Sequence, residues 1–357
     1  MGNFLIKDSI SSIFTRNKPL WIAGPCSVES AEQITQIAIS LKSYGADILR
    51  GGIWKPRTHP DSFEGVGQIG LQWLKEASIT AGIPCATEVA NAKHTELALK
   101  AGIDIFWIGA RTTGNPFLVT EIAEALKGCK VSVMVKNPLN PDIELWLGAI
   151  ERLSNADIDN ICAIHRGFFC YQKSIYRNPP LWQIPVEIKR RRPDIPIICD
   201  PSHITGERTK VEEVSSEALA LGFDGLMIEV HPCPEKALSD ARQQITPEEF
   251  KHLMDSISIR KDMGFSQSSE ESIAQIRASI DIVDQTLIET LAHRMELVES
   301  IGRLKAKENI SVLQADRWNT VLSKIGKCAE KNNLDKNFVE KIFNLIHEES
   351  MERQIRQ

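Results

Sequence analysis

The sequence lacks several features that would assign it to a common protein class. No apolar run is long enough to cross a membrane, and the polar stretch from Met1 to Pro19 has no continuous apolar segment of the kind that a signal peptide needs. Positive charge is not in excess, because the formal net charge is −5, and this argues against nucleic acid as a partner. The eight cysteines are scattered and form no CxxC pair. We therefore expect a cytoplasmic protein without membrane partners that acts on small molecules.

The chain has 357 residues, which is too long for one ordinary hydrophobic core, so two domains are expected. Composition changes near residue 262, where the polar segment DMGFSQSSEE begins. We predict a first domain over 1–261, a linker over 262–271 that ends in a helix N-cap, and a second domain over 272–357.

The first domain alternates strand-length apolar runs with helical stretches. Glycines such as Gly45 and Gly82 stand where helices should end. Eight alternations over about 250 residues predict an α/β fold of the (β/α)8 barrel type, and the absence of a Gly-rich dinucleotide loop weakens the alternative of an open, doubly wound sheet. The predicted strands are Trp21–Ala23, Ala46–Leu49, Ile83–Thr87, Ile105–Ile108, Val131–Val135, Ile161–Ile164, Ile195–Cys199 and Gly225–Val230.

The second domain has a helical period. From Ile273 to Leu304 the apolar residues recur at steps of three and four, which predicts an amphipathic helix of about 35 residues, roughly 50 Å long. Two shorter helices are predicted near Ala315–Asn332 and Asp335–Arg356. Two short partners cannot cover so long an apolar stripe, so we predict an all-α three-helix domain that forms a homodimer, with larger assemblies left open.

Polar and ionisable residues follow all eight predicted strands. In a (β/α)8 barrel these strand ends meet at one mouth, where the chemistry of such barrels takes place. One loop, Lys55-Pro56-Arg57-Thr58, crowds two cations after a strand that ends in Arg50, and phosphate suits such groups. A solvated basic turn is the alternative for that loop alone. The convergence of eight polar strand ends favours a catalytic mouth that binds anions.

Two kinds of chemistry are predicted in this mouth. Six cations there would repel one another unless substrates with several negative charges neutralise them, and two phosphate-bearing substrates would do so. These cations are Arg50, Lys55, Arg57, Arg111, Lys136 and Arg166. One sulfur, one nitrogen and two oxygen donors form a candidate site for a divalent metal. These donors are Cys26, His203, Glu229 and Asp240, and His231 is ranked as an outer neighbour. Each taken singly also has a structural interpretation, such as a buried thiol or a turn cap.

Six motifs in this order carry a resemblance: GPCSVES, LRGGIWKPRT, GART, VKNP, DPSH and IEVHP…ALSD. As a set they resemble 3-deoxy-D-arabino-heptulosonate 7-phosphate (DAHP) synthases of the short, type I-beta kind, over about residues 18–260. The related ketodeoxyoctulosonate-phosphate synthases, which use arabinose 5-phosphate, share the barrel but differ where this chain has KPRT. The resemblance implies a condensation of phosphoenolpyruvate with erythrose 4-phosphate in the shikimate pathway.

The resemblance also implies roles for the residues that match the motifs. Cys26, His203, Glu229 and Asp240 would hold one divalent metal ion, with Mn, Fe, Co and Zn all suited to the mixed donors. Phosphoenolpyruvate would contact Arg50, Lys55, Arg111, Lys136 and Arg166, and erythrose 4-phosphate would contact Arg57 and Thr58. Glu88 would lie near the reacting carbons. Lys55 is a candidate proton donor to the new alkoxide, provided that its neighbours depress its pKa.

The helical segment carries a second resemblance. IRASIDIVDQTLIETLAHR, Lys305, ADRW and SMERQ resemble the all-helical chorismate mutases over about residues 268–357. That family rearranges chorismate to prephenate without a cofactor. The resemblance assigns chorismate binding to Arg277 of the partner chain and to Arg294, Lys305, Arg317, Ser350 and Gln354, and catalysis at the ether oxygen to Lys305 and Gln354. Trp318 and Gln314 replace acids of the family pattern that contact the ring hydroxyl.

We therefore expect a bifunctional enzyme. The mutase domain is also expected to mediate feedback, since chorismate or prephenate bound there could alter the packing of the domains. Two alternatives are kept. The helical domain could be a non-catalytic module that dimerises and senses ligand, or the barrel could take arabinose 5-phosphate.

Overall fold

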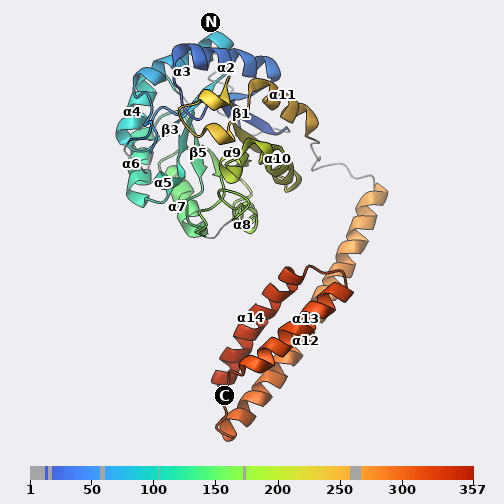
Figure 1. Cartoon of the computed structure of the whole chain (residues 1–357). Helices are drawn as coiled ribbons and strands as arrows, with labels where there is room; N and C mark the ends of the chain where they lie inside the picture. Colours follow the sequence, from blue (N-terminus) through green and yellow to red (C-terminus); the bar gives the residue numbers. More distant parts are fainter. Residues whose placement is uncertain (1–12, 15–17, 57–60, 104, 172–173, 258–266) are drawn as a thin grey trace. The chain divides into compact units, whose positions relative to one another are not determined.

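The computed structural model describes residues 13–14, 18–56, 61–103, 105–171, 174–257 and 267–357. The chain divides into two compact units, Met1–Asp262 and Met263–Gln357 (Figure 1). Much of the predicted linker at 262–271 lies outside the described residues, and a helix already begins at Gln267. The bounds of the linker therefore stay a prediction.

The first unit is a closed barrel of eight parallel strands, as predicted. Each strand pairs with the next one along the chain, and β8 closes the ring on β1 with a register that runs from Leu20 opposite Gly225 to Gly24 opposite Glu229. The strands are β1 (Leu20–Gly24), β2 (Ile48–Arg50), β3 (Cys85–Val89), β4 (Ile105–Ile108), β5 (Ser132–Lys136), β6 (Asn160–His165), β7 (Ile197–Cys199) and β8 (Gly225–Glu229).

Helices surround the barrel (Figure 1). They are α2 (Ala31–Tyr44), α3 (Ile69–Ala81), α4 (Ala92–Lys100), α5 (Ala110–Thr113), α6 (Pro116–Leu126), α7 (Ile143–Ser154), α8 (Gln183–Arg191), α9 (Pro201–Thr205), α10 (Val211–Ala220) and α11 (Pro247–Ser256), with short 3₁₀ turns η1 (Arg208–Lys210), η2 (Pro234–Lys236) and η3 (Ala241–Gln243). Helix α2 ends as the sequence predicted, because Gly45 adopts a left-handed φ of 96° that a residue with a Cβ would disfavour.

Alternation along each strand builds two cores. Leu20 and Ile22 of β1 belong to the cluster inside the barrel, together with Trp107 of β4. Trp21 and Ala23, one residue away, belong to the layer between the sheet and the helices. This period of two is what a barrel requires, because successive side chains point to opposite faces of the sheet. The strand ends are thereby held in fixed positions around one mouth.

The second unit consists of α12 (Gln267–Lys307), α13 (Ala315–Lys331) and α14 (Lys336–Ile355). Helix α12 has 41 residues and is longer than predicted, because the Ser- and Glu-rich segment assigned to the linker is already helical from Gln267. An ion pair between Arg353 and Glu299, at 2.9 Å, ties α14 to α12. Among the described helices, none combines the length and the apolar character that a membrane span requires.

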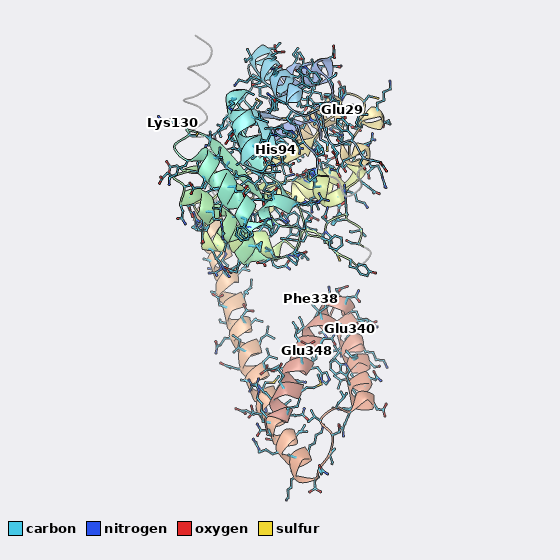
Figure 2. The ribbon with its side chains drawn as sticks, turned by 90° about the vertical axis from the view of Figure 1, so that its left-hand side faces the viewer. Glu29, His94, Lys130, Phe338, Glu340 and Glu348 are labelled. Carbon is cyan, nitrogen blue, oxygen red and sulfur yellow. The ribbon has the colours of Figure 1, made fainter. Side chains whose placement is uncertain are left out.

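Much of the apolar surface of this unit is exposed within the single chain. Ile280 and Leu287 of α12 are 51% and 56% exposed, and Phe338 of α14, whose side chain is marked in Figure 2, is 54% exposed. In the barrel, by contrast, apolar side chains such as those of Ile22 and Ile198 are buried.

Candidate active site

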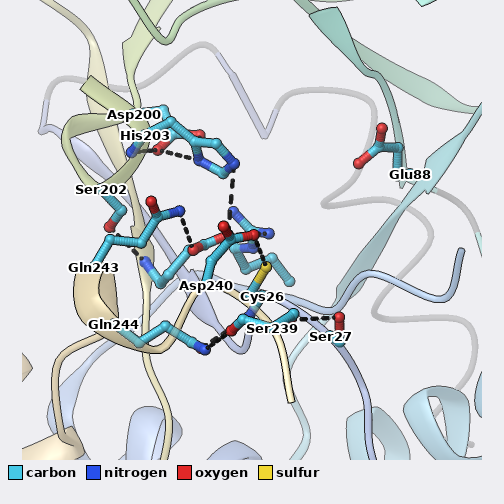
Figure 3. Close-up of polar contacts among 12 residues, drawn as sticks. Cys26, Ser27, Glu88, Asp200, Ser202, His203, Ser239, Asp240, Gln243 and Gln244 are labelled. Carbon is cyan, nitrogen blue, oxygen red and sulfur yellow. Dashed lines mark hydrogen bonds and ion pairs between the residues drawn. The ribbon is translucent and has the colours of Figure 1, made fainter. Parts of the chain in front are cut away.

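The mouth of the barrel collects the residues that follow β1, β7 and β8 (Figure 3). Gly24 ends β1 with a φ of 148°, and a Cβ there would lie 2.0 Å from the backbone oxygen of Arg50, so only glycine lets the two strand ends approach. Cys26 follows after Pro25 and is fully buried. Its backbone NH donates to Gln244 Oε1 at 2.9 Å, which fixes the start of this loop against the segment after β8.

The four predicted metal ligands come together as two pairs. Cys26 Sγ lies 3.3 Å from Asp240 Oδ2, and His203 Nε2 lies 3.8 Å from Glu229 Oε1. Within the described part of the chain, no three His, Cys, Asp or Glu side chains lie close enough together to form a complete ligand set. The structure therefore brings these four residues close together, and their role as metal ligands stays a prediction.

The surroundings of His203 fit a metal-ligating histidine. Asp200 caps the short helix α9 through the backbone NH of His203 at 3.1 Å, and its carboxylate lies 2.8 Å from His203 Nδ1. A carboxylate on Nδ1 fixes the ring orientation and leaves Nε2 toward Glu229, which is the arrangement found behind ligating histidines. Glu229 is fully buried, and its Oε1 forms an ion pair with Arg50 Nη2 at 3.0 Å but no further hydrogen bond to the described residues. The donor chemistry and this outer support both suit a divalent ion.

Burial and charge shift the pKa values of these groups in different directions. Burial, with a further contribution from Glu229, raises the pKa of the Cys26 thiol to about 12. Burial lowers the pKa of His203. Burial alone would raise the pKa of Glu229, but His203 and Arg50 outweigh it and the net pKa is lowered. Glu229 is thus an ionised carboxylate at neutral pH, as a ligand of a cation must be.

Arg50 is the clearest sign of an anion site. Its side chain is 1% exposed, yet Nε and Nη1 have no hydrogen-bond partner among the described residues. Nη2 lies 3.0 Å from Glu229 Oε1, and the guanidinium stacks over the ring of Trp107 at 4.9 Å. A buried guanidinium with two unpaired nitrogens is costly unless a ligand satisfies it. This geometry therefore calls for an anion in the mouth.

Two further cations of the mouth are buried and held in place. Lys136 Nζ is 2.8 Å from Asp200 Oδ2, and Arg166 is 8% exposed. Asn137 joins the ends of β5 and β6, since its Oδ1 accepts from the backbone NH of Arg166 at 2.7 Å and its Nδ2 donates to Gly167 O at 2.8 Å. Burial lowers the pKa of Arg166 to about 10.

Lys55 lies in the mouth, but its pKa moves in the direction opposite to the one that the proton-donor role was said to require. Its Nζ folds over Gly52, where an added Cβ would come within 2.7 Å of it. Burial lowers the pKa of Lys55, but the acidic groups of Cys26 and Glu229 outweigh burial and the pKa is raised. The condition of a depressed pKa for Lys55 is therefore not met. Lys55 is a protonated cation at neutral pH.

Glu88 lies at the end of β3 in the same region (Figure 3). Trp107 Nε1 donates to its Oε2 at 3.0 Å, and a Cβ on Gly109 would lie 2.1 Å from its Oε1. Arg111 lies in α5, shortly after the end of β4, and is exposed. Arg57 and Thr58 lie outside the described residues.

The helical unit brings only part of the predicted mutase set together. Arg294 Nη1 donates to Ser350 Oγ at 2.6 Å across α12 and α14, and Lys305 Nζ donates to Val312 O at 2.6 Å. Gln354, one turn beyond Ser350, has a buried Oε1 without a partner among the described residues. Arg317 is exposed on α13. Arg277 is exposed on α12, and its role in the site of a partner chain stays a prediction.

The two departures from the mutase pattern have visible consequences. Trp318 stacks on His347 with ring centroids 3.9 Å apart and an interplanar angle of 7°, which joins α13 to α14. Gln314 is the N-cap of α13, but its side chain makes no capping hydrogen bond. The aromatic stack therefore takes the place of an acid at this position of the bundle.

Several residues that shape the mouth were not found from the sequence. Asp200, the first residue of the DPSH motif, was given no role, and it binds both Lys136 and His203. Arg177 and Gln243 were not selected at all, because an arginine in an irregular loop and a glutamine in a 3₁₀ turn carry no pattern. The convergent strand ends could have identified Asp200, since it directly follows β7.

The chain also matches two families of known proteins. Residues 6–262 match the model of the DAHP synthetase I family. This chain belongs to that family. Residues 276–355 match the model described as chorismate mutase type II. A DAHP synthase domain is therefore fused to a C-terminal chorismate mutase domain, as the sequence motifs predicted.

Individual relatives agree with this assignment of the synthase domain. A phospho-2-dehydro-3-deoxyheptonate aldolase of Thermotoga maritima is 37% identical over 233 residues, which cover 65% of this chain and 67% of that protein. A 2-dehydro-3-deoxyphosphooctonate aldolase of Geotalea daltonii is 27% identical over 255 residues, or 65% of this chain and 89% of that protein. The crystal structure of the DAHP synthase from Thermotoga maritima superimposes with a TM-score of 0.62 at 36% identity, covering 67% of this chain and 68% of the other.

Proposed function

We propose that this bifunctional shikimate-pathway enzyme condenses phosphoenolpyruvate with erythrose 4-phosphate in a metal-dependent reaction and rearranges chorismate to prephenate. The observation that carries the first activity is Arg50, a buried guanidinium with two unpaired nitrogens beside Glu229. The identity of 37% with a heptulosonate enzyme, against 27% with an octulosonate enzyme, favours the four-carbon aldose phosphate.

The cations of the mouth would hold the two anionic substrates together. Arg111, Lys136 and Arg166 would bind the phosphate of phosphoenolpyruvate, while Arg50 and Lys55 would bind its carboxylate. Arg57 and Thr58 would hold the phosphate of the aldose. Two anions that repel each other in water would thus be fixed at reacting distance, which combines positioning with electrostatic stabilisation.

Cys26, His203, Glu229 and Asp240 would hold one divalent ion, of Mn, Fe, Co or Zn. When bound, such an ion polarises a carbonyl oxygen as a Lewis acid. C3 of phosphoenolpyruvate forms the new bond to the aldehyde carbon. Lys55 Nζ, which is protonated at neutral pH, gives a proton to the far more basic oxygen that becomes the hydroxyl. Water then adds at C2, the bond between C2 and the phosphate oxygen breaks, and phosphate leaves. Glu88, held by Trp107, would orient the water.

Lys55 has a direct test. Lys55→Met should abolish condensation while metal binding stays nearly intact, because the variant keeps the length of the side chain and loses the proton. Substantial residual turnover would exclude this role.

Substrate choice also has a direct test. The purified enzyme is given phosphoenolpyruvate with either erythrose 4-phosphate or arabinose 5-phosphate, and phosphate release is measured. Faster release with arabinose 5-phosphate would overturn the assignment.

The mutase site would act without a covalent step and without a cofactor. Arg294 and Arg277 of the partner subunit would bind the carboxylates of chorismate, with Arg317 and Ser350 lining the site. Lys305 and Gln354 would donate to the ether oxygen, where negative charge grows in the transition state.

Lys305→Ala should lower the rate of chorismate disappearance by about 10² to 10³-fold. Lys307→Ala is the matched control, because Lys307 is an exposed lysine two residues further along α12. Full activity of Lys305→Ala would favour a purely ligand-sensing module.

We also propose that prephenate or chorismate, bound in the helical domain, inhibits condensation. The fusion of enzymes that do not catalyse consecutive steps supports this link. Condensation rates at saturating prephenate should fall. Unchanged rates would refute the regulatory role.

A further inference from the structure

The dipeptide Arg177-Asn178, from the loop between β6 and α8, contacts the surroundings of the candidate metal site on several sides. Arg177 Nη1 donates to Asp240 Oδ1 at 3.1 Å and to Gln243 Oε1 at 3.0 Å. Gln243 Nε2 in turn donates to Glu229 Oε2 at 2.7 Å. Asn178 Nδ2 donates to the backbone oxygen of His203 at 2.7 Å. Three of the four candidate ligands are therefore tied to one short segment.

We propose that Arg177 and Gln243 form a relay that positions Asp240 and Glu229 for the metal ion. This inference rests on the proposed metal-dependent function. The relay leaves one oxygen of each carboxylate for other contacts: Arg177 takes Oδ1 of Asp240, so that Oδ2 lies toward Cys26, and Gln243 takes Oε2 of Glu229, so that Oε1 lies toward His203. Hydrogen-bonded partners of this kind fix the orientation of ligating carboxylates.

The backbone shows that the dipeptide is held where it is. Arg177 NH donates to Thr205 O at 3.2 Å, and Asn178 NH donates to Ile204 O at 3.0 Å, so the segment lies along the end of α9 that follows His203. Gly206 has a φ of 67°, and a Cβ there would come within 2.7 Å of the Arg177 side chain. The loop is thus docked on α9, the helix that carries His203.

Asp240 needs such a partner because its own backbone is not held by a regular element. It has a φ of 45° and precedes the short turn η3, in the left-handed region that few residues other than glycine adopt. The Gln243 side chain is 1% exposed, so its two hydrogen bonds are made in a site that excludes water. The side chain of Arg177 is 55% exposed, so it can be replaced without opening the core.

The alternative role for Arg177 is to bind the phosphate of the substrate. Its charge contributes to the lowered pKa of Arg166, which places it near the cations expected to bind phosphate. An arginine that binds substrate would change the KM for phosphoenolpyruvate and leave metal binding alone. An arginine that positions Asp240 would change metal binding in the absence of any substrate.

The test titrates Co²⁺ alone into the metal-free full-length protein and follows the absorption band of thiolate bound to cobalt. We expect Arg177→Gln and Gln243→Met each to weaken Co²⁺ binding by about 10 to 100-fold, and Arg177→Lys to lie between Arg177→Gln and wild type. Arg242→Gln is the matched control, because Arg242 lies beside Gln243 in η3, is 80% exposed and pairs with Glu207 at 2.7 Å. It should bind Co²⁺ within about threefold of wild type. Thermal unfolding of the metal-free proteins verifies that each variant is folded.

Wild-type affinity for Co²⁺ in both Arg177→Gln and Gln243→Met would overturn the relay, as would a rise in the KM for phosphoenolpyruvate with unchanged Co²⁺ binding. Equal loss in Arg242→Gln would also contradict it, because the effect would then not depend on the contacts of Arg177. If wild type itself gives no thiolate band with Co²⁺, the proposed metal site fails before the relay is tested.

Discussion

The barrel and the helical unit place their functional residues in very different surroundings. Arg50 and Glu229 of the barrel are 1% and 0% exposed and lie 3.0 Å apart, whereas Arg277 and Arg317 of the helical unit are exposed. A closed parallel sheet buries its strands and fixes its strand ends within one chain. A bundle of three helices cannot cover a 41-residue helix in the same way. We infer that the barrel site is built by one chain and that the mutase site needs two.

Metal removal should separate the two units most sharply. Treatment with a chelator, or the change Cys26→Ala, should reduce condensation to background and leave chorismate disappearance unchanged, because all four candidate metal ligands belong to the barrel. Both rates are measured on the same protein sample. Loss of both activities would show that the two sites are not independent, and loss of neither would contradict metal dependence.

The exposed apolar side chains of α12, such as Ile280, Val283 and Leu287, allow a test of whether the helical unit forms a dimer. Val283→Asp places a charge where 57% of an apolar side chain is exposed, and in a dimer that buries this stripe the charge would be strongly unfavourable. We expect sedimentation to show monomers and the mutase rate to fall by about tenfold or more, since the site would lose the arginine of the partner chain.

Asp284→Asn, at the adjacent position of α12, serves as the control for Val283→Asp and should remain dimeric. Condensation by Val283→Asp should continue. A variant that stays dimeric with full mutase activity would show that the interface lies elsewhere.

The sequence predicted the barrel because strand length, helix length and strand-end polarity are local patterns. Cys26, His203 and Glu229 lie at or shortly after strand ends, and fold topology alone brings these ends together, whereas Asp240 lies farther along the segment after β8, beyond the turn η2. The pairing of Cys26 with Asp240, and of His203 with Glu229, depends on loop geometry and could not be read from spacing.

Interactions between charged groups that are far apart in the chain could not be predicted from the sequence. The proton-donor role of Lys55 was made conditional on neighbours that depress its pKa. The groups that raise the pKa instead, Cys26 after β1 and Glu229 at the end of β8, are distant in the chain. Arg177 was missed for the same reason, because its partner Asp240 lies 63 residues away.

The pH dependence of stability should also differ between the units. His165 of the barrel lies among the rings of Phe168, Trp182 and Phe223 at centroid distances of 5.3 to 6.1 Å, and burial lowers its pKa from 6.5 to about 3. The unfolded chain then binds a proton that the folded chain excludes. The free energy of unfolding should therefore decrease as the pH falls below about 6.5, by about 1.4 kcal/mol per pH unit until the pH approaches 3.

His165→Phe keeps an aromatic ring of similar size and removes this titration. Relative to the variant, wild type should lose about 2 kcal/mol of unfolding free energy between pH 6.5 and pH 5. Urea unfolding followed by tryptophan fluorescence reports mainly on the barrel, which contains every tryptophan except Trp318. Parallel pH profiles for the two proteins would mean that His165 is already charged in the folded state.

Helix capping gives the smallest expected difference and the most local one. Helix α11 of the barrel unit begins with a complete capping box, in which Thr246 and Glu249 each accept from the backbone of the other, whereas Gln314 begins α13 without a side-chain cap. Thr246→Ala should therefore destabilise the barrel by about 1 kcal/mol, and Gln314→Ser should stabilise the helical unit by up to about 1 kcal/mol. Thermal unfolding of the two variants measures both changes. If Gln314→Ser gained nothing, the end of α13 would already be satisfied by another contact, and the two units would be equally well capped.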